Sequence, residues 1–140
     1  MWEVLSRPMQ TFLPYSSFDL TMECLDYRRL GKQRVEAFQI LRALRGETDG
    51  WTNHPATRMW RGHEDGLAHY MNCSIFEWVK RGYKNSMALS QLSGPLTKVA
   101  FPKWLGDVDF HKAHQSNLLR KDPKFYSFDV PADLPYIWPN

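Results

Sequence analysis

Residues 27–44 read YRRLGKQRVEAFQILRAL, and this stretch decides the fold. Its apolar side chains recur at helical spacing, so the stretch predicts an amphipathic helix. Gly46 follows as a C-cap glycine, and Gly31 is expected to separate an entry turn from the helix proper. The side chains that we expect to form its buried stripe are Leu30, Ala37, Phe38, Leu41 and Leu44.

Three further helices are expected around this one. A short helix runs from Ser16 or Ser17 to about Leu25, because either serine can cap it. A third begins at Asn53-His54-Pro55, bends at Gly62 and ends at Gly82, and the last covers about 107–121. No alternation of period two is present, and the proline-rich tail is expected to be extended, with its aromatic rings packed over the helices. The fold class is therefore mainly α: a compact single-domain helical bundle with an extended aromatic C-terminal segment.

The composition is that of one globular domain. The chain has 140 residues, of which 43% are hydrophobic, and this suffices to bury a core. No apolar run is long enough to span a membrane, and the first residues are too short and polar for a signal peptide. Cys24 and Cys73 stand alone in apolar stretches, so we expect free thiols and a cytoplasmic location. A net charge of +3 permits a phosphate-binding face.

The richest polar stretch is at the start of the central helix. Four cations lie within seven residues there and are candidate phosphate ligands: Arg28, Arg29, Lys32 and Arg34. The alternative is a solvated face with an intrahelical ion pair between Lys32 and Glu36. Sequence leaves both interpretations open.

Glu36 is the one carboxylate among these cations. It shares a helix face with Arg29 and Gln33, and the apolar stripe is expected to turn this face away from the core. The neighbouring cations are expected to keep Glu36 ionised. Such a carboxylate could stabilise a cationic sugar intermediate or move a proton, or it could be a plain salt-bridge partner.

Two other polar stretches are candidates for a ligand pocket. Residues 53–64 combine a helix N-terminus with His and Arg side chains, and residues 111–121 carry two histidines three positions apart. No acidic or cysteine partner completes a metal site there, so no metal is expected. The alternatives are a capping His54, a core Trp60 and a packed final helix. The candidate pocket residues are Asn53, His54, Arg58, Trp60, His63, His111, His114 and Gln115.

Two basic segments are candidate DNA contacts outside the central helix. Residues 80–84 form a basic turn that ends in an aromatic side chain, and the final helix ends in two cations. A buried tyrosine at a helix end explains the first segment equally well. The candidate contacts are Lys80, Arg81, Tyr83, Arg120 and Lys121.

Five segments, in this order, resemble one known family. They are MQTFLPY at 9–15, LGKQRVEA at 30–37, GWTNHP at 50–55, VKRGY at 79–83 and HQSNLLRK at 114–121. The sequence is similar to the pyrimidine-dimer DNA glycosylases of the endonuclease V type, and more closely to their little-characterised bacterial branch. The resemblance implies one helical domain at 9–140, preceded by an extension at 1–8.

The resemblance also implies DNA as the substrate and no metal. We expect a monomer that acts on double-stranded DNA, needs no cofactor and is associated with the nucleoid. In that family an α-amine at the chain start attacks C1′ of the sugar, and the Schiff base formed can eliminate to cut the strand. The family's glutamate follows Tyr-Arg directly, where this chain has Arg29. Glu36, or else Asp26, is then the expected carboxylate, and the nucleophile is the terminal amine, Lys32 or water. A non-catalytic DNA- or nucleotide-binding module on the same scaffold is the alternative function.

Overall fold

The structure is a computed structural model that describes residues 9–139. Within that range there are five α-helices, one 3-10 helix and no strand, so the predicted mainly α class is confirmed. The helices are α2 (Phe18–Cys24), α3 (Tyr27–Leu44), α4 (Pro55–Arg58), α5 (Glu64–Lys80), the 3-10 helix η1 (Leu96–Lys98) and α6 (Val108–Lys121).

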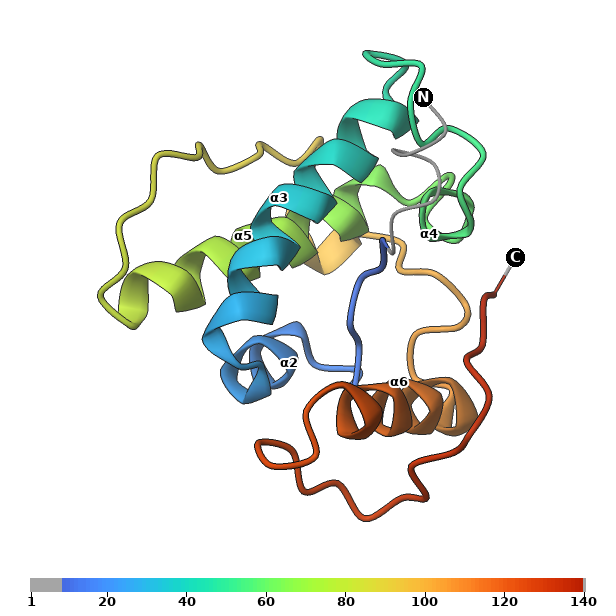
Figure 1. The fold of residues 1–140 in the computed structure, drawn as a ribbon. Helices are drawn as coiled ribbons and strands as arrows, with labels where there is room; N and C mark the ends of the chain where they lie inside the picture. The colour runs from blue at the N-terminus through green and yellow to red at the C-terminus, as the bar shows by residue number, and fades with distance from the viewer. Residues whose placement is uncertain (1–8, 140) are drawn as a thin grey trace.

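The centre of the fold is the packing of α3 on α5, which lie side by side in Figure 1. Their facing side chains form the middle of one hydrophobic core. The N-terminal segment 9–16 runs between this pair and α6 (Figure 1). The fully buried core side chains from α3 and α5 include Leu30, Ile40, Leu41, Leu67, Tyr70 and Met71.

The helix predicted from Asn53 to Gly82 is two helices, and the expected bend at Gly62 is wrong. The backbone of Gly62 has φ +83°, a left-handed conformation that a right-handed helix cannot continue. A turn therefore separates α4 from α5. The predicted start is confirmed, because the His54 side chain caps α4 and Pro55 occupies its first turn.

Two predictions about α3 are also corrected. The helix runs through Gly31 without an entry turn. A Cβ at this position would lie 2.9 Å from a ring carbon of Trp78, so glycine lets α3 pack closely on α5. Phe38 was expected in the buried stripe but is 43% exposed, while Ile40 two positions later is fully buried.

The predicted extended aromatic tail is confirmed. Residues 122–139 contain no helix or strand, and the ring of Tyr126 is buried. The Arg120 guanidinium fixes the tail to α6 by donating to the carbonyl oxygens of Ala132 and Leu134, each at 2.9 Å. Cys24 and Cys73 are free thiols. No helix in the described part of the chain is long and apolar enough to cross a membrane.

Candidate nucleic-acid interface and active site

The first half of α3 forms a wall shared by two cavities. The polar cavity, of about 560 Å³, lies between α3 and the end of α6. The aromatic cavity, of about 500 Å³, lies on the other side of the same wall, against α5. Both are lined by Tyr27, Arg28, Lys32 and Glu36. The polar cavity also has Gln10, Asp26, Arg29 and Lys121, and the aromatic cavity has Met9, Gly31, Gln39, Trp51 and Trp78.

Glu36 lies at the division between the two cavities. Its side chain is 13% exposed, and one carboxylate oxygen accepts a hydrogen bond from the backbone nitrogen of Gln10 at 3.1 Å. The other oxygen is 3.9 Å from Lys32 Nζ, one helical turn away. The carboxylate is therefore fixed in position while it remains part of both cavity walls.

The cations around Glu36 are not the largest influence on its pKa. Burial raises the pKa of Glu36, and this outweighs the lowering by the Gln10 N–H, Lys32 and Lys121. The net shift is upward, so a proton binds to this carboxyl more readily than to a solvated glutamate. A carboxyl of this kind is suited to exchanging a proton during catalysis.

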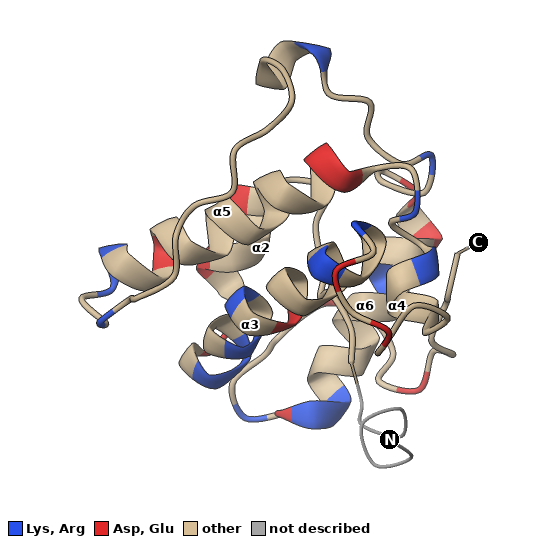
Figure 2. Ribbon diagram, turned by 90° about the horizontal axis from the view of Figure 1, so that it is seen from above, with Lys and Arg blue, Asp and Glu red and all other residues tan. Residues whose placement is uncertain are grey.

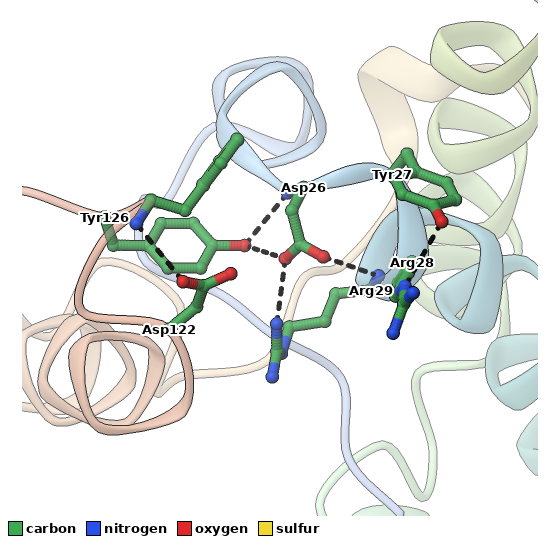
Figure 3. Close-up of polar contacts among 7 residues, drawn as sticks. Asp26, Tyr27, Arg28, Arg29, Asp122 and Tyr126 are labelled. Atoms are coloured by element: carbon green, nitrogen blue, oxygen red, sulfur yellow. Dashed lines mark hydrogen bonds and ion pairs between the residues drawn. The ribbon is translucent and has the colours of Figure 1, made fainter.

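Asp26, the second candidate carboxylate, joins three segments (Figure 3). It caps α3, pairs with the Arg29 guanidinium at 3.1 Å and accepts a hydrogen bond from the Tyr126 hydroxyl. Burial by itself would raise the pKa of Asp26, but the hydrogen bonds from Tyr126 and Arg29 together lower it. Asp26 is thus an ionised group whose oxygens are already engaged.

Cations surround the polar cavity. Figure 2 shows the Lys and Arg positions at the start of α3 near those at the end of α6. Arg28, Arg29, Lys32 and Lys121 all line this cavity. Burial, followed by the positive charges of Arg29 and Lys32, lowers the pKa of Lys121, although Glu36 acts in the opposite direction. Three of the four predicted α3 cations, Arg28, Arg29 and Lys32, therefore line one cavity together with Lys121 from α6, whereas Arg34 does not.

The polar face of α3 was expected to point away from the core, and the buried side chain of Gln33 shows that this orientation is wrong. Its side chain is fully buried, accepts from the backbone nitrogen of Phe12 at 3.0 Å and donates to the carbonyl oxygen of Gln10 at 3.1 Å. The hydroxyl of Tyr70 on α5 also donates to it. The face thus points inward onto segment 9–13, and Gln33 holds the Gln10 nitrogen beside Glu36.

Two predicted DNA contacts lie at Trp78. The Arg34 guanidinium carbon is 4.2 Å from the centre of the Trp78 ring, and its nitrogen donates to Asn85 at 2.7 Å. The Tyr83 ring also packs against Trp78, with the two ring centres 4.4 Å apart, and Tyr83 is 40% exposed. Arg34 is absent from the lining of either cavity, whereas Trp78 borders the aromatic one.

Three other predicted contacts lie outside both cavities. Arg81 pairs with Glu77 at 2.8 Å and donates to the carbonyl oxygens of Met22 and Glu23, so it ties the end of α5 to the end of α2. Arg120 holds the tail as described above. Lys80 lies beside Arg81 at the end of α5, exposed to solvent. Their expected roles in DNA binding stay predictions.

The residues predicted to line one lesion pocket are not brought together. Trp60 and His114 are fully buried in the core, and the His54 side chain caps α4. Gln115 and His111 border a separate cavity of about 680 Å³ between α6 and the tail. Asn53 and Arg58 are exposed near α4, and His63 contacts the carbonyl oxygen of Ala100.

The α6 histidines hold segment 9–16 in place. His114 Nδ1 accepts from the backbone nitrogen of Leu13 at 2.9 Å, and His111 Nδ1 is 2.7 Å from the carbonyl oxygen of Leu13. Burial, with a smaller contribution from His111, lowers the pKa of His114 to about 3. The His114 ring is therefore neutral, and its contact with Leu13 serves to hold the N-terminal segment. Among the described residues no group of three His, Cys, Asp or Glu could hold a metal ion.

The cavity residues that sequence reasoning missed include Gln10, Trp51 and Trp78. The Gln10 contact with Glu36 spans 26 positions and leaves no local signal. Trp51 has a positive φ of 70°, which sequence does not reveal for a tryptophan. There was one indirect signal for Trp78 in the sequence. Gly31 lies inside a strongly predicted helix, and a glycine in such a place indicates that another group packs closely against it, which here is Trp78.

Comparison with protein families identifies the relationship. A family described as pyrimidine dimer DNA glycosylase has a model that matches residues 9–91. The chain belongs to this family. The matched range contains segment 9–16 and α2 to α5, and with them Asp26, Lys32 and Glu36, whereas α6 lies beyond it. Comparisons with curated proteins and with solved structures give no match. At the level of the family, the function is DNA glycosylase chemistry in DNA repair, and the substrate is DNA.

Proposed function

We propose that this protein is a base-excision glycosylase that removes damaged or modified pyrimidines from double-stranded DNA and cuts abasic sites through an amine Schiff base. One observation carries the proposal: a desolvated carboxylate, Glu36, forms the wall between a cation-rich cavity and an aromatic one. The two cavities match the two chemically different halves of a nucleotide.

The polar cavity suits the sugar and its phosphates. Four cations and three carboxylates line it, so the cations exceed the carboxylates by one: Arg28, Arg29, Lys32 and Lys121 against Asp26, Glu36 and Asp122. Contacts of this kind to phosphate fix the position and register of a protein on a duplex and make its affinity salt-dependent.

The aromatic cavity suits a base that has left the duplex stack. Its lining includes the aromatic side chains of Trp51, Trp78 and Tyr27 and the polar side chains of Gln39 and Glu36. Enzymes that act on a base in duplex DNA extrude the nucleotide and read it by stacking and by hydrogen bonds to the base edge. A damaged pyrimidine in this cavity would place its sugar next to Glu36.

Glu36 is the carboxylate that serves the sugar. As the glycosidic bond breaks, positive charge develops at C1′, and an ionised carboxylate beside it lowers the barrier. The raised pKa of Glu36 also lets it hold a proton and return it. Asp26 is less suited, because its oxygens are engaged by Arg29 and Tyr126.

The test is single-turnover release of a pyrimidine from its sugar in a duplex that carries a pyrimidine dimer. We expect the wild-type protein to act on the damaged duplex and not on the undamaged one, and Glu36→Gln to slow it by about 100- to 10,000-fold. The matched control is Glu47→Gln, an exposed glutamate paired with Arg42 at 3.8 Å, which should retain the full rate. Salt-sensitive binding by both wild type and Glu36→Gln, with the damaged duplex left intact, would favour the non-catalytic binding module.

A further inference from the structure

The hydroxyl of Tyr126 makes two hydrogen bonds to a single residue, Asp26. It accepts from the backbone nitrogen of Asp26 at 2.9 Å and donates to one carboxylate oxygen, Oδ1. The contact joins the tail to the start of α3, as Figure 3 shows. Because the hydroxyl bonds to both the main chain and the side chain of Asp26, it fixes the direction in which the carboxylate points.

Tyr126 is itself held firmly in place. Its ring is 5% exposed and lies nearly parallel to the ring of Phe128, with 10° between the two planes. The turn after α6 holds its backbone, since the carbonyl oxygen of Asp122 accepts from the Tyr126 nitrogen at 3.1 Å. The hydroxyl is therefore a fixed point to which the Asp26 carboxylate is attached.

The same carboxylate oxygen of Asp26 also accepts a hydrogen bond from Arg29. The Nη1 atom of Arg29 lies 3.1 Å from Oδ1, and the Arg29 side chain is 23% exposed and lines the polar cavity. A guanidinium has several N–H donors, so a contact at Nη1 leaves others to face the cavity. A free arginine side chain samples many rotamers, and its planar fork binds phosphate best when it is already aimed. The contact with Asp26 supplies that orientation.

We propose that Tyr126 is a positioning residue for DNA binding: through Asp26, its hydroxyl holds the Arg29 guanidinium in the orientation that binds a phosphate of the DNA backbone. The proposal rests on the DNA binding that the proposed function requires, and it adds a residue that controls how the strand is placed. It also accounts for a carboxylate in a cavity suited to phosphate. Asp26 would by itself repel a phosphate, and its role there is to orient a cation. Tyr126 lies outside residues 9–91, so the family match does not indicate it.

The salt dependence of binding tests the proposal with the full chain. Fluorescence anisotropy with a labelled duplex that carries a pyrimidine dimer gives the slope of log affinity against log salt. We expect Tyr126→Phe, which keeps the ring and removes only the hydroxyl, to weaken binding and reduce the slope by about one unit. The double variant Tyr126→Phe/Arg29→Gln should match Arg29→Gln alone, because both changes remove the same phosphate contact. The matched control Tyr15→Phe removes a hydroxyl outside the polar cavity and should leave the slope unchanged.

Asp26→Asn is a second variant, for which simple electrostatics predicts the opposite result. Asparagine still caps a helix, so α3 keeps its start. Removing a negative charge beside bound DNA would by itself strengthen binding. The proposal predicts weaker binding and a lower slope, because Arg29 loses the ion pair that orients it. Tighter binding by Asp26→Asn would overturn the proposal.

The remaining outcomes separate this proposal from the function on which it rests. An unchanged slope for Tyr126→Phe, or a double variant with a lower slope than Arg29→Gln, would overturn the role of the hydroxyl and retain the glycosylase. The predicted loss of slope, with a wild type that binds the duplex but releases no base, would support the positioning role and overturn the glycosylase. No salt-dependent binding by the wild type would overturn both.

Discussion

The start of α3 and the inner face of α6 are equally polar in sequence but differ in what their side chains contact. At the start of α3, Arg28, Lys32 and Glu36 border both cavities. On α6, His111, His114 and Gln115 are used internally, because each contacts a backbone atom of Leu13 or Pro14. The first region is equipped to bind, and the second supports it.

Segment 9–14 connects the two regions. The α6 side chains fix its residues 13 and 14, while Gln33 of α3 fixes residues 10 and 12. The result is the contact between the Gln10 nitrogen and Glu36. The comparison teaches that a polar residue marks a site only where its hydrogen-bonding capacity is not already used by the chain.

The largest expected effect is on stability and comes from α6, which holds segment 9–16 in place. Replacing His114 with Ala removes a fully buried ring and leaves the Leu13 nitrogen without its acceptor. We expect the free energy of unfolding to fall by about 3 kcal/mol, as measured by urea denaturation at pH 7. The exposed neighbour Lys112→Ala is the control and should change it by less than about 0.5 kcal/mol. A loss no larger than that of the control would contradict the supporting role of α6.

The next effect is the pH dependence that His114 confers. Its folded pKa, about 3, lies below the ordinary histidine value of 6.5, so only the unfolded chain takes up this proton at pH 5. Its contribution to stability is present above pH 6.5 and is lost as pH falls toward 3. From pH 7 to pH 5 the wild type should lose about 2 kcal/mol more than His114→Asn. Parallel pH profiles for the two proteins would show that His114 is not buried in its neutral form.

Glu36 should show the opposite sign. Its folded pKa is raised above the ordinary glutamate value of 4.5, so the folded state binds the proton more tightly. This contribution is fully present below pH 4.5 and is lost as pH rises through the folded pKa. Glu36→Gln should therefore be at least as stable as wild type at pH 7, although it loses base release. Thermal melts across pH 4–8 provide the measurement, and a marked destabilisation at pH 7 would make Glu36 a structural residue.

The smallest effect concerns salt-dependent binding at the α3 cations. Replacing Arg29 with Gln removes one cation of the polar cavity and should reduce the slope of log affinity against log salt by about one unit. Fluorescence anisotropy with a labelled duplex at several salt concentrations measures the slope. Arg42→Gln, at the far end of α3 and paired with Glu47, should leave it unchanged. Equal slopes for both variants would remove the start of α3 from the interface.

Much of the helical framework was predictable because its signals are local. The bounds of α3, its apolar period and the caps at Ser17, Asp107 and His54 depend on residues a few positions apart. The clustering of the α3 cations was predictable for the same reason. Glu36 also stood out as the one carboxylate among them, although its upward pKa shift did not.

The rest depends on contacts between distant parts of the chain. Gln33 was expected to face solvent, and it is buried because segment 9–13 packs against α3 and needs hydrogen-bond partners there. Glu36 and Lys121 line the same polar cavity, although they lie on two helices that are far apart in sequence. The histidines of α6 were predicted to line a pocket because the sequence does not show that their ring nitrogens contact the backbone of Leu13.

The most direct test of the central claim is a crystal structure of Glu36→Gln bound to a duplex that carries a pyrimidine dimer. The account predicts the damaged nucleotide at α3, with its sugar beside residue 36, its phosphates near Arg29 and Lys32, and an extruded base against Trp51 and Trp78. A duplex bound instead at the cavity between α6 and the tail, near His111 and Gln115, would contradict it.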